Sequence, residues 1–186
     1  MANLLLGVSA SAACFKAAAL ASSLHGKGHQ VQVVLTPSAA KLVAPLQFSC
    51  LTGRNALVSE FDGEGADPSG MDHISLAREA DLLLMAPATA DLIGQLAHGL
   101  APNLLTTLAL AIESHKPRLL APAMNPAMWA QPAVQRNLIT LQQDGWQLLA
   151  PAEGHTACGE DGHGRLQGVP DLVVAVEAAL AAGGKA

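Results

Sequence analysis

The chain has 186 residues, of which 51% are hydrophobic and only 13% are charged, and its formal net charge is -5. A disordered chain combines low hydrophobicity with high net charge, so this composition excludes that class. A nucleic-acid groove needs clustered basic residues, and the 10 Lys and Arg form no such run, so we expect no nucleic-acid partner. The low charge instead favours burial of one face in a homo-oligomer.

Cysteine usage and the apolar runs indicate the compartment. Cys14, Cys50 and Cys158 contain no CxxC pair, so we expect neither a disulfide framework nor a metal site. The first apolar run, residues 4–8, is too short for a signal peptide and follows no basic residue. The longest uncharged stretch, residues 92–112, holds too many polar side chains to span a membrane. We therefore expect a cytoplasmic protein without a membrane segment.

Short apolar runs alternate with amphipathic stretches along the chain. The apolar runs predict strands buried on both faces at residues 4–8, 31–35, 82–86, 119–121 and 147–150. The amphipathic stretches predict helices at residues 12–27, 39–46, 90–99, 103–113, 132–144 and 170–182. This alternation is typical of an α/β fold, a doubly wound parallel sheet with helices on both faces. We expect residues 1–186 to form one Rossmann-like (flavodoxin-like) domain, with a surface loop at residues 53–70.

Ligands of such a sheet bind beyond the carboxyl ends of the strands, so the residues there are the candidates for function. The first strand is followed by Ser9 and Ser11 at a helix start, where hydroxyls and backbone N–H groups suit a phosphate. Helix capping explains these serines equally well. After the second strand come Thr36 and Ser38, where an NAD site would have an acidic residue. A mononucleotide or flavin phosphate is therefore favoured over a dinucleotide.

The third and fourth strands end in further candidates. Thr89 and Asp91 open a helix after the third strand. Asn125 precedes Pro126 after the fourth strand, which is the pattern of a helix N-cap, although its amide could also reach a ligand carboxylate. His73 stands before a helix upstream of the third strand, where a structural histidine is the commoner explanation.

A glycine-rich segment at residues 157–165 contains Cys158 between small residues. A flexible loop explains it, and so does a lid that brings a thiol onto a ligand. The residues alone leave both explanations open.

Five motifs in chain order resemble the homo-oligomeric flavin-containing cysteine decarboxylases over nearly the whole chain. They are GVSASAACFK, MDHI, APATADLIGQLAHGLAPNLLTT, APAMNPAMW and ACGEDGHGR. The resemblance implies FMN as cofactor, held by Ser9, Ala10, Ser11, Ala12, Thr36, Pro37, Ser38, Thr89, Ala90, Asp91, Leu92, Thr106 and Ala123. It also implies catalytic roles for three residues: His73 as the active-site histidine, Asn125 as the ligand of the cysteine carboxylate, and Cys158 as the proton donor. Met124, Ala157 and Gly159 would join Asn125 and Cys158 in contacting the substrate.

The activity implied by this resemblance is oxidative decarboxylation of a small cysteine-carboxylate substrate. The expected reaction converts 4′-phosphopantothenoylcysteine to 4′-phosphopantetheine in coenzyme A biosynthesis, in a trimer or in a dodecamer built of trimers. Two alternatives are a related flavoprotein with another substrate (a peptidyl-cysteine decarboxylase or a relative that forms prenyl-FMN) and a non-catalytic flavin-binding regulatory subunit. The ACG motif argues against the first alternative, because decarboxylases that stop at the ene-thiol are expected to lack the reducing cysteine.

Overall fold

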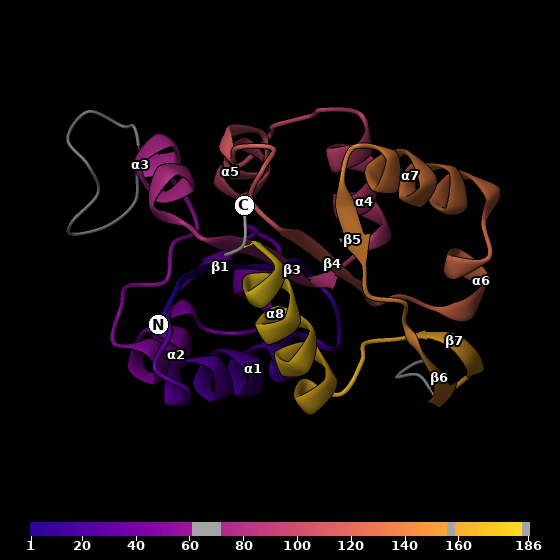
Figure 1. Ribbon diagram of the computed structural model, residues 1–186. Coiled ribbons are helices and arrows are strands. Elements are labelled where there is room, and N and C mark those ends of the chain that lie inside the picture. Colours follow the sequence, from indigo (N-terminus) through magenta and orange to yellow (C-terminus); the bar gives the residue numbers. More distant parts are fainter. Residues whose placement is uncertain (61–71, 156–158, 184–186) are drawn as a thin grey trace.

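A five-stranded parallel sheet forms the centre of the molecule (Figure 1). The computed structural model describes residues 1–60, 72–155 and 159–183. The strands are β1 (Asn3–Val8), β2 (Gln30–Leu35), β3 (Leu82–Ala88), β4 (Arg118–Pro122) and β5 (Trp146–Leu148). Their order is β2-β1-β3-β4-β5, the flavodoxin-like order, in which the chain changes direction across the sheet between β1 and β3. The predicted α/β fold is confirmed.

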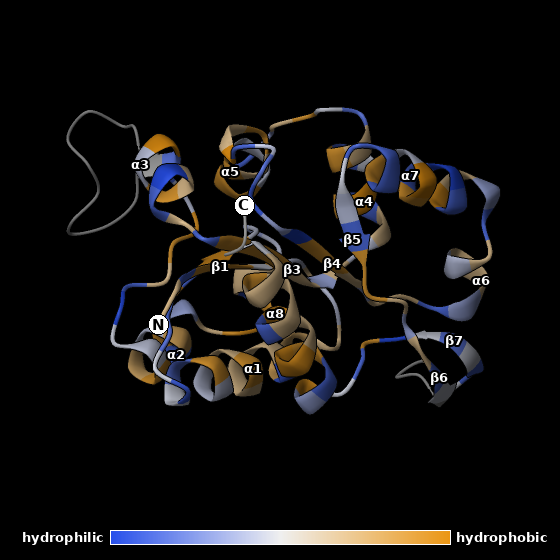
Figure 2. Ribbon diagram, in the orientation of Figure 1, coloured by the Kyte–Doolittle hydropathy of each residue, from blue (hydrophilic) through white to orange (hydrophobic). Residues whose placement is uncertain are grey.

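Helices cover both faces of the sheet, because strands β1 to β4 place buried apolar side chains on both sides (Figures 1 and 2). One face carries α1 (Cys14–Gly26), α2 (Pro45–Thr52) and α8 (Val169–Gly183). The other carries α3 (Asp72–Glu79), α4 (Ala90–Ala97), α5 (Leu104–Ala111) and α7 (Pro132–Gln143). A 3-10 turn, η1 (Ala39–Lys41), follows β2, and a short helix, α6 (Pro126–Trp129), follows β4.

Gly7 sets how closely α5 approaches the sheet. A Cβ atom at this position would lie 2.4 Å from Met85 Sδ and 2.6 Å from Leu105 Cδ1. Both neighbours are buried side chains. Since only glycine leaves that space free, this residue holds the end of β1 in place beside β3 and α5.

Two sequence predictions about helices are wrong in detail. The predicted helix at residues 39–46 is divided into η1 and α2, because Pro45 cannot continue a helix and holds Ala44 in an extended conformation with ψ 129°. His73 lies inside α3 and not ahead of a helix.

Two predicted loops also differ from expectation. Leu57 pairs with the edge of β2, its N–H donating to Val33 O at 3.0 Å, so residues 53–60 are partly sheet-bound, and residues 61–70 lie outside the described residues. The glycine-rich segment ends in a strand, β7 (Asp161–Arg165), which pairs antiparallel with β6 (Ala152–His155) to form a hairpin. Its period-2 signal is hidden because glycine alternates with polar residues in β7.

Candidate functional site

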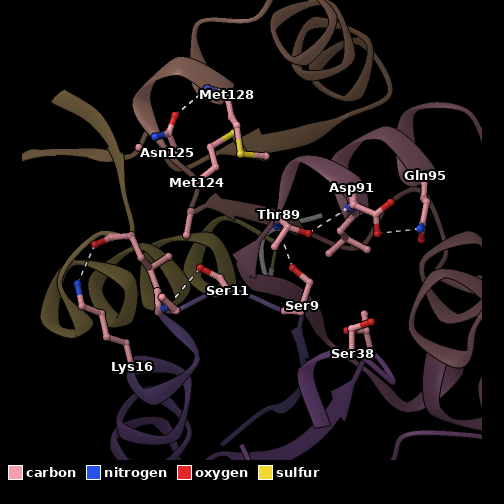
Figure 3. A pocket seen from close by; sticks show the side chains of 18 of the residues that line it. Ser9, Ser11, Lys16, Ser38, Thr89, Asp91, Gln95, Met124, Asn125 and Met128 are labelled. Atoms are coloured by element: carbon pink, nitrogen blue, oxygen red, sulfur yellow. Dashed lines mark hydrogen bonds between the residues drawn. The ribbon is translucent and has the colours of Figure 1, made fainter. Parts of the chain in front are cut away.

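A cavity of about 1080 Å³ opens at the carboxyl ends of β1, β2, β3 and β4. It lies where the strand order reverses between β1 and β3, which is the usual ligand crevice of an open α/β sheet. Figure 3 shows Ser38 on one side of this cavity, with Asn125, Met124 and Met128 on the opposite side. Its polar lining therefore comes from strand ends that are far apart in the sequence.

Ser9 braces the floor of the cavity. Its hydroxyl donates to Pro87 O at 2.8 Å and accepts from the N–H of Thr89 at 2.9 Å (Figure 3). Its backbone N–H also donates to Pro87 O, at 3.1 Å. Because the side chain is 2% exposed, these bonds join the ends of β1 and β3 without competition from water.

Three helices present their N-terminal ends to the cavity. The loop before α1 is closed by Ser11, whose hydroxyl accepts from the N–H of Ala13 at 3.2 Å. Thr89 caps α4 by accepting from the N–H of Leu92 at 3.3 Å. Asn103 caps α5. Helix N-termini carry partial positive charge, so their convergence favours a ligand with a phosphate.

The turn after β2 supplies hydroxyl groups to the same cavity. Thr36 Oγ1 accepts from the N–H of Ala39 at 3.1 Å and so takes the position of a cap for η1. Ser38 directly precedes η1, but its side chain makes no capping bond and lines the cavity. Its hydroxyl is therefore not used in capping the turn.

The Asn125 side chain is held in one orientation at the start of α6. Its Oδ1 atom accepts from the N–H of Ala127 at 2.7 Å and from the N–H of Met128 at 3.2 Å (Figure 3). The amide nitrogen consequently faces away from the helix, and it donates to Glu160. The sequence interpretation of Asn125 as an N-cap is confirmed, and the same geometry presents an N–H donor at the edge of the cavity.

Strand β7 packs directly on the segment that carries Asn125. Met124 N–H donates to Gly164 O at 2.9 Å, and a Cβ atom at Gly164 would lie 2.3 Å from Met124 O. A Cβ atom at Gly162 would lie 3.2 Å from Pro126. These glycines let the hairpin form one wall of the cavity.

Two cations lie on the cavity wall next to this hairpin. Lys16 donates from Nζ to Leu166 O at 3.0 Å, and burial together with the nearby positive charge of Arg165 lowers the pKa of its ammonium group. Phe15 lies beside them with 67% of its side chain exposed. Sequence reasoning missed all three residues; Lys16 could have been found as the cation that follows the first strand-end motif.

Most of the predicted site residues meet at this cavity. Those lining it are Ser9, Ala10, Ser11, Ala12, Thr36, Pro37, Ser38, Thr89, Asp91, Leu92, Ala123, Met124 and Asn125. Ala90 and Gly159 are not in the lining, and Thr106 is fully buried in a capping box with Asn103, which lines the cavity in its place. Ala157 and Cys158 lie outside the described residues.

His73 is not brought to the cavity that holds Asn125. It lies on α3, which packs against α5, and Figure 1 shows this helix at the opposite end of the molecule from α6 and the hairpin. Its Nδ1 atom is 2.7 Å from Oε1 of Glu60, a close contact that lacks the angular geometry of a hydrogen bond. Within one chain, therefore, two of the proposed catalytic residues are separated.

Within residues 1–60, 72–155 and 159–183, no three His, Cys, Asp or Glu side chains group as metal ligands would. Among the helices described there, none has the length and hydropathy needed to cross a bilayer.

Comparisons with known proteins place the chain among flavoproteins. The model of the Flavoprotein family matches residues 1–181. A probable phosphopantothenoylcysteine decarboxylase of Streptococcus mutans is 38% identical over 178 residues, which cover 96% of this chain and 98% of that protein. The coenzyme A biosynthesis bifunctional protein CoaBC of Bacillus subtilis is 43% identical over 94% of this chain but only 42% of its own length.

Solved structures agree with the sequence comparison. The FMN-dependent cysteine decarboxylase SpaF superposes with a TM-score of 0.81 at 31% identity, over 99% of this chain and 98% of that one. The chain thus spans less than half the length of the CoaBC relative and nearly all of the other two proteins.

Proposed function

This chain belongs to the Flavoprotein family, and on that basis we propose that it binds FMN and decarboxylates 4′-phosphopantothenoylcysteine to 4′-phosphopantetheine in coenzyme A biosynthesis. The position of Asn125 carries the proposal. Its amide donor lies on the same cavity as the helix N-termini that bear hydroxyl groups. Two relatives whose names contain phosphopantothenoylcysteine decarboxylase or coenzyme A biosynthesis support the choice of substrate. We propose a cytoplasmic location, in keeping with the free thiols of Cys14 and Cys50.

The residues present fit FMN. The cavity volume of about 1080 Å³ is at the upper end of the range for cofactor sites. Three helix N-termini suit the phosphate, and the small or apolar residues Ala10, Ala123 and Leu92 leave flat walls for an isoalloxazine ring. When bound, FMN would supply the two-electron oxidation at the thiol-bearing carbon that provides an electron sink for loss of CO2.

The chain's own residues would orient the substrate and move a proton. Asn125 would donate its amide N–H to the cysteine carboxylate, in the orientation that the N–H groups of Ala127 and Met128 impose on it. Cys158 would then donate a proton to the carbon from which CO2 has left, a role assigned by the family motif ACG. His73 would lie near the substrate thiol as base or positioning group.

We propose further that the enzyme is a homo-oligomer, built of trimers, with each site shared between two copies. The separation of α3 from the Asn125 side of the cavity supports this, because a second copy could bring His73 to a site that its own chain leaves incomplete. Exposed apolar side chains at the cavity support it as well: Phe15 is 67% exposed and Met128 is 46% exposed.

Absorption spectroscopy and turnover test the proposed activity. The purified protein should show an oxidised-flavin spectrum that heat denaturation releases into the supernatant, and it should convert phosphopantothenoylcysteine to phosphopantetheine. Asn125→Asp should abolish turnover by repelling the substrate carboxylate while keeping the flavin spectrum. A protein that stays colourless with added FMN, or full turnover by Asn125→Asp, would contradict the proposal.

Subunit complementation tests the shared site. His73→Ala and Asn125→Ala homo-oligomers should each be inactive. Mixed oligomers, formed by co-expression of the two variants with different affinity tags, should regain part of the activity at sites that combine an intact His73 with an intact Asn125. Mixed oligomers without activity, or a monomer by light scattering, would refute sharing.

Another cysteine-carboxylate substrate is the second candidate, favoured by the similarity to SpaF along nearly the entire chain. Competition between phosphopantothenoylcysteine and a peptide with C-terminal cysteine distinguishes the two. The first proposal requires a higher kcat/KM for the phosphorylated substrate.

A further inference from the structure

Glu160 lies on the amide of Asn125. The Asn125 Nδ2 atom donates to Oε2 of Glu160, so a carboxylate of the protein itself contacts the donor that we assign to the substrate. Glu160 directly precedes β7, and its side chain is exposed to solvent. The contact thus joins the hairpin to the start of α6.

Both partners of this contact, Asn125 and Glu160, are held in place by their neighbours. On one side, the amide oxygen of Asn125 is occupied by two backbone N–H groups, so only the nitrogen is turned outward. On the other side, β7 is pressed against residues 124–126 through Gly162 and Gly164, which places the residue before the strand beside Asn125. Glu160 is therefore positioned by the wall of the cavity and not by a chance surface approach.

We propose that the Glu160 carboxylate stands in for the substrate carboxylate at Asn125 and competes with it, which makes Glu160 a residue that sets affinity and specificity. This inference rests on the proposed function of Asn125. Two carboxylates at one neutral amide repel each other, so a bound substrate has to displace Glu160 or bear its repulsion. After CO2 is lost, the product has no carboxylate, and Glu160 can take the amide again while the product leaves.

Two ligands that differ only in the carboxylate should respond differently to the loss of Glu160. A ligand with the carboxylate binds more weakly because it must displace Glu160 from the Asn125 amide. A ligand without the carboxylate does not bind that amide and does not displace Glu160. Removing Glu160 should therefore tighten binding of the first and leave the second unchanged. The expected tightening is about three- to tenfold, the range of one hydrogen bond in protein.

Titration calorimetry on the FMN-loaded protein measures this difference with two unreactive probes. One is phosphopantothenoylserine, in which a hydroxyl replaces the substrate thiol, and the other is phosphopantothenoylethanolamine, which also lacks the carboxylate. Glu160→Ala should lower the Kd of the serine probe only. Glu160→Gln, which removes the charge and keeps an acceptor, should have an intermediate effect.

The matched control is Glu153→Ala, which removes an exposed carboxylate from β6 of the same hairpin and should change neither Kd. Circular dichroism and flavin content confirm that each variant is folded and loaded. Equal tightening of both probes, or none, would overturn the role of Glu160 while the proposed function stands. Failure of the unmodified protein to bind either probe would overturn the proposed function and this inference with it.

Discussion

Replacing Ser9 by Ala tests whether the ends of β1 and β3 are joined through one hydroxyl. The variant removes the bond to Pro87 O at 2.8 Å and the bond from the Thr89 N–H at 2.9 Å. Pro87 O keeps the backbone N–H of Ser9 as a donor, at 3.1 Å. The main loss is therefore at Thr89, whose half-buried N–H loses its acceptor in the alanine variant.

The expected loss of stability follows from the lost acceptor of the Thr89 N–H. The Thr89 N–H is half-buried, so the loss of its acceptor should cost about 1 kcal/mol, the net value of an ordinary hydrogen bond. Thr89 also caps α4 and lines the cavity, so a displaced Thr89 should weaken FMN binding in addition to lowering the free energy of unfolding.

Denaturant unfolding of the flavin-free protein, at one fixed protein concentration, measures the stability term without a contribution from bound ligand. Ser22→Ala on the exposed side of α1 is the matched control and should change stability by no more than about 0.5 kcal/mol. If Ser9→Ala falls within the range of this control and binds FMN normally, the hydroxyl does not brace the site.

Gly164, Asn103 and Glu177 each make a contact whose loss can be measured. Gly164→Ala should lower the free energy of unfolding by at least about 1–3 kcal/mol and raise KM, because its Cβ would lie 2.3 Å from Met124 O. Gly28→Ala is the control for backbone strain in these unfolding experiments, because Gly28 also has a positive φ but no atom lies near its Cβ position. Asn103→Ala should cost about 1 kcal/mol by removing the cap of α5, and flavin titration should show weaker FMN binding. The hydrogen bond from His29 lowers the pKa of the Glu177 carboxyl below its usual value, so the bond adds stability above the unfolded-state pKa of about 4.3 and loses it as the pH falls. The difference in unfolding free energy between the unmodified protein and Glu177→Gln should accordingly shrink below that pH.

The fold could be predicted from the sequence because its main signals are local. Each buried strand is a short apolar run, and the alternation with helices leaves few arrangements of a parallel sheet. The elements that were missed depend on distant contacts: Leu57 joins the edge of β2, and β7 is held by Met124. Neither contact leaves a periodic pattern in its own segment.

The same distinction applies to the site. Residues at strand ends were found because topology alone brings carboxyl ends together, as for Ser38, Thr89 and Asn125. The individual roles were not predictable, since Ser9 braces two strands and Thr106 is buried in a cap, although both have the residue type of a phosphate ligand. Side-chain direction decides between these roles, and it depends on packing partners elsewhere in the chain.

The glycines of β7 show why a composition typical of flexibility can instead support close packing. Gly162 and Gly164 have φ angles of 150° and 139°. A Cβ atom at Gly164 would clash with Met124 O, and a Cβ atom at Gly162 would require Pro126 to shift. Their effect is to place Glu160 on the Asn125 amide at one end of β7 and Arg165 on the cavity wall at the other. The hairpin thus sets a negative and a positive group near Asn125, while the helix N-termini face the cavity from the other strand ends. A ligand with a carboxylate must therefore be recognised against the charges of this hairpin, which is why its exposed residues, and not only the buried donors, are expected to determine specificity.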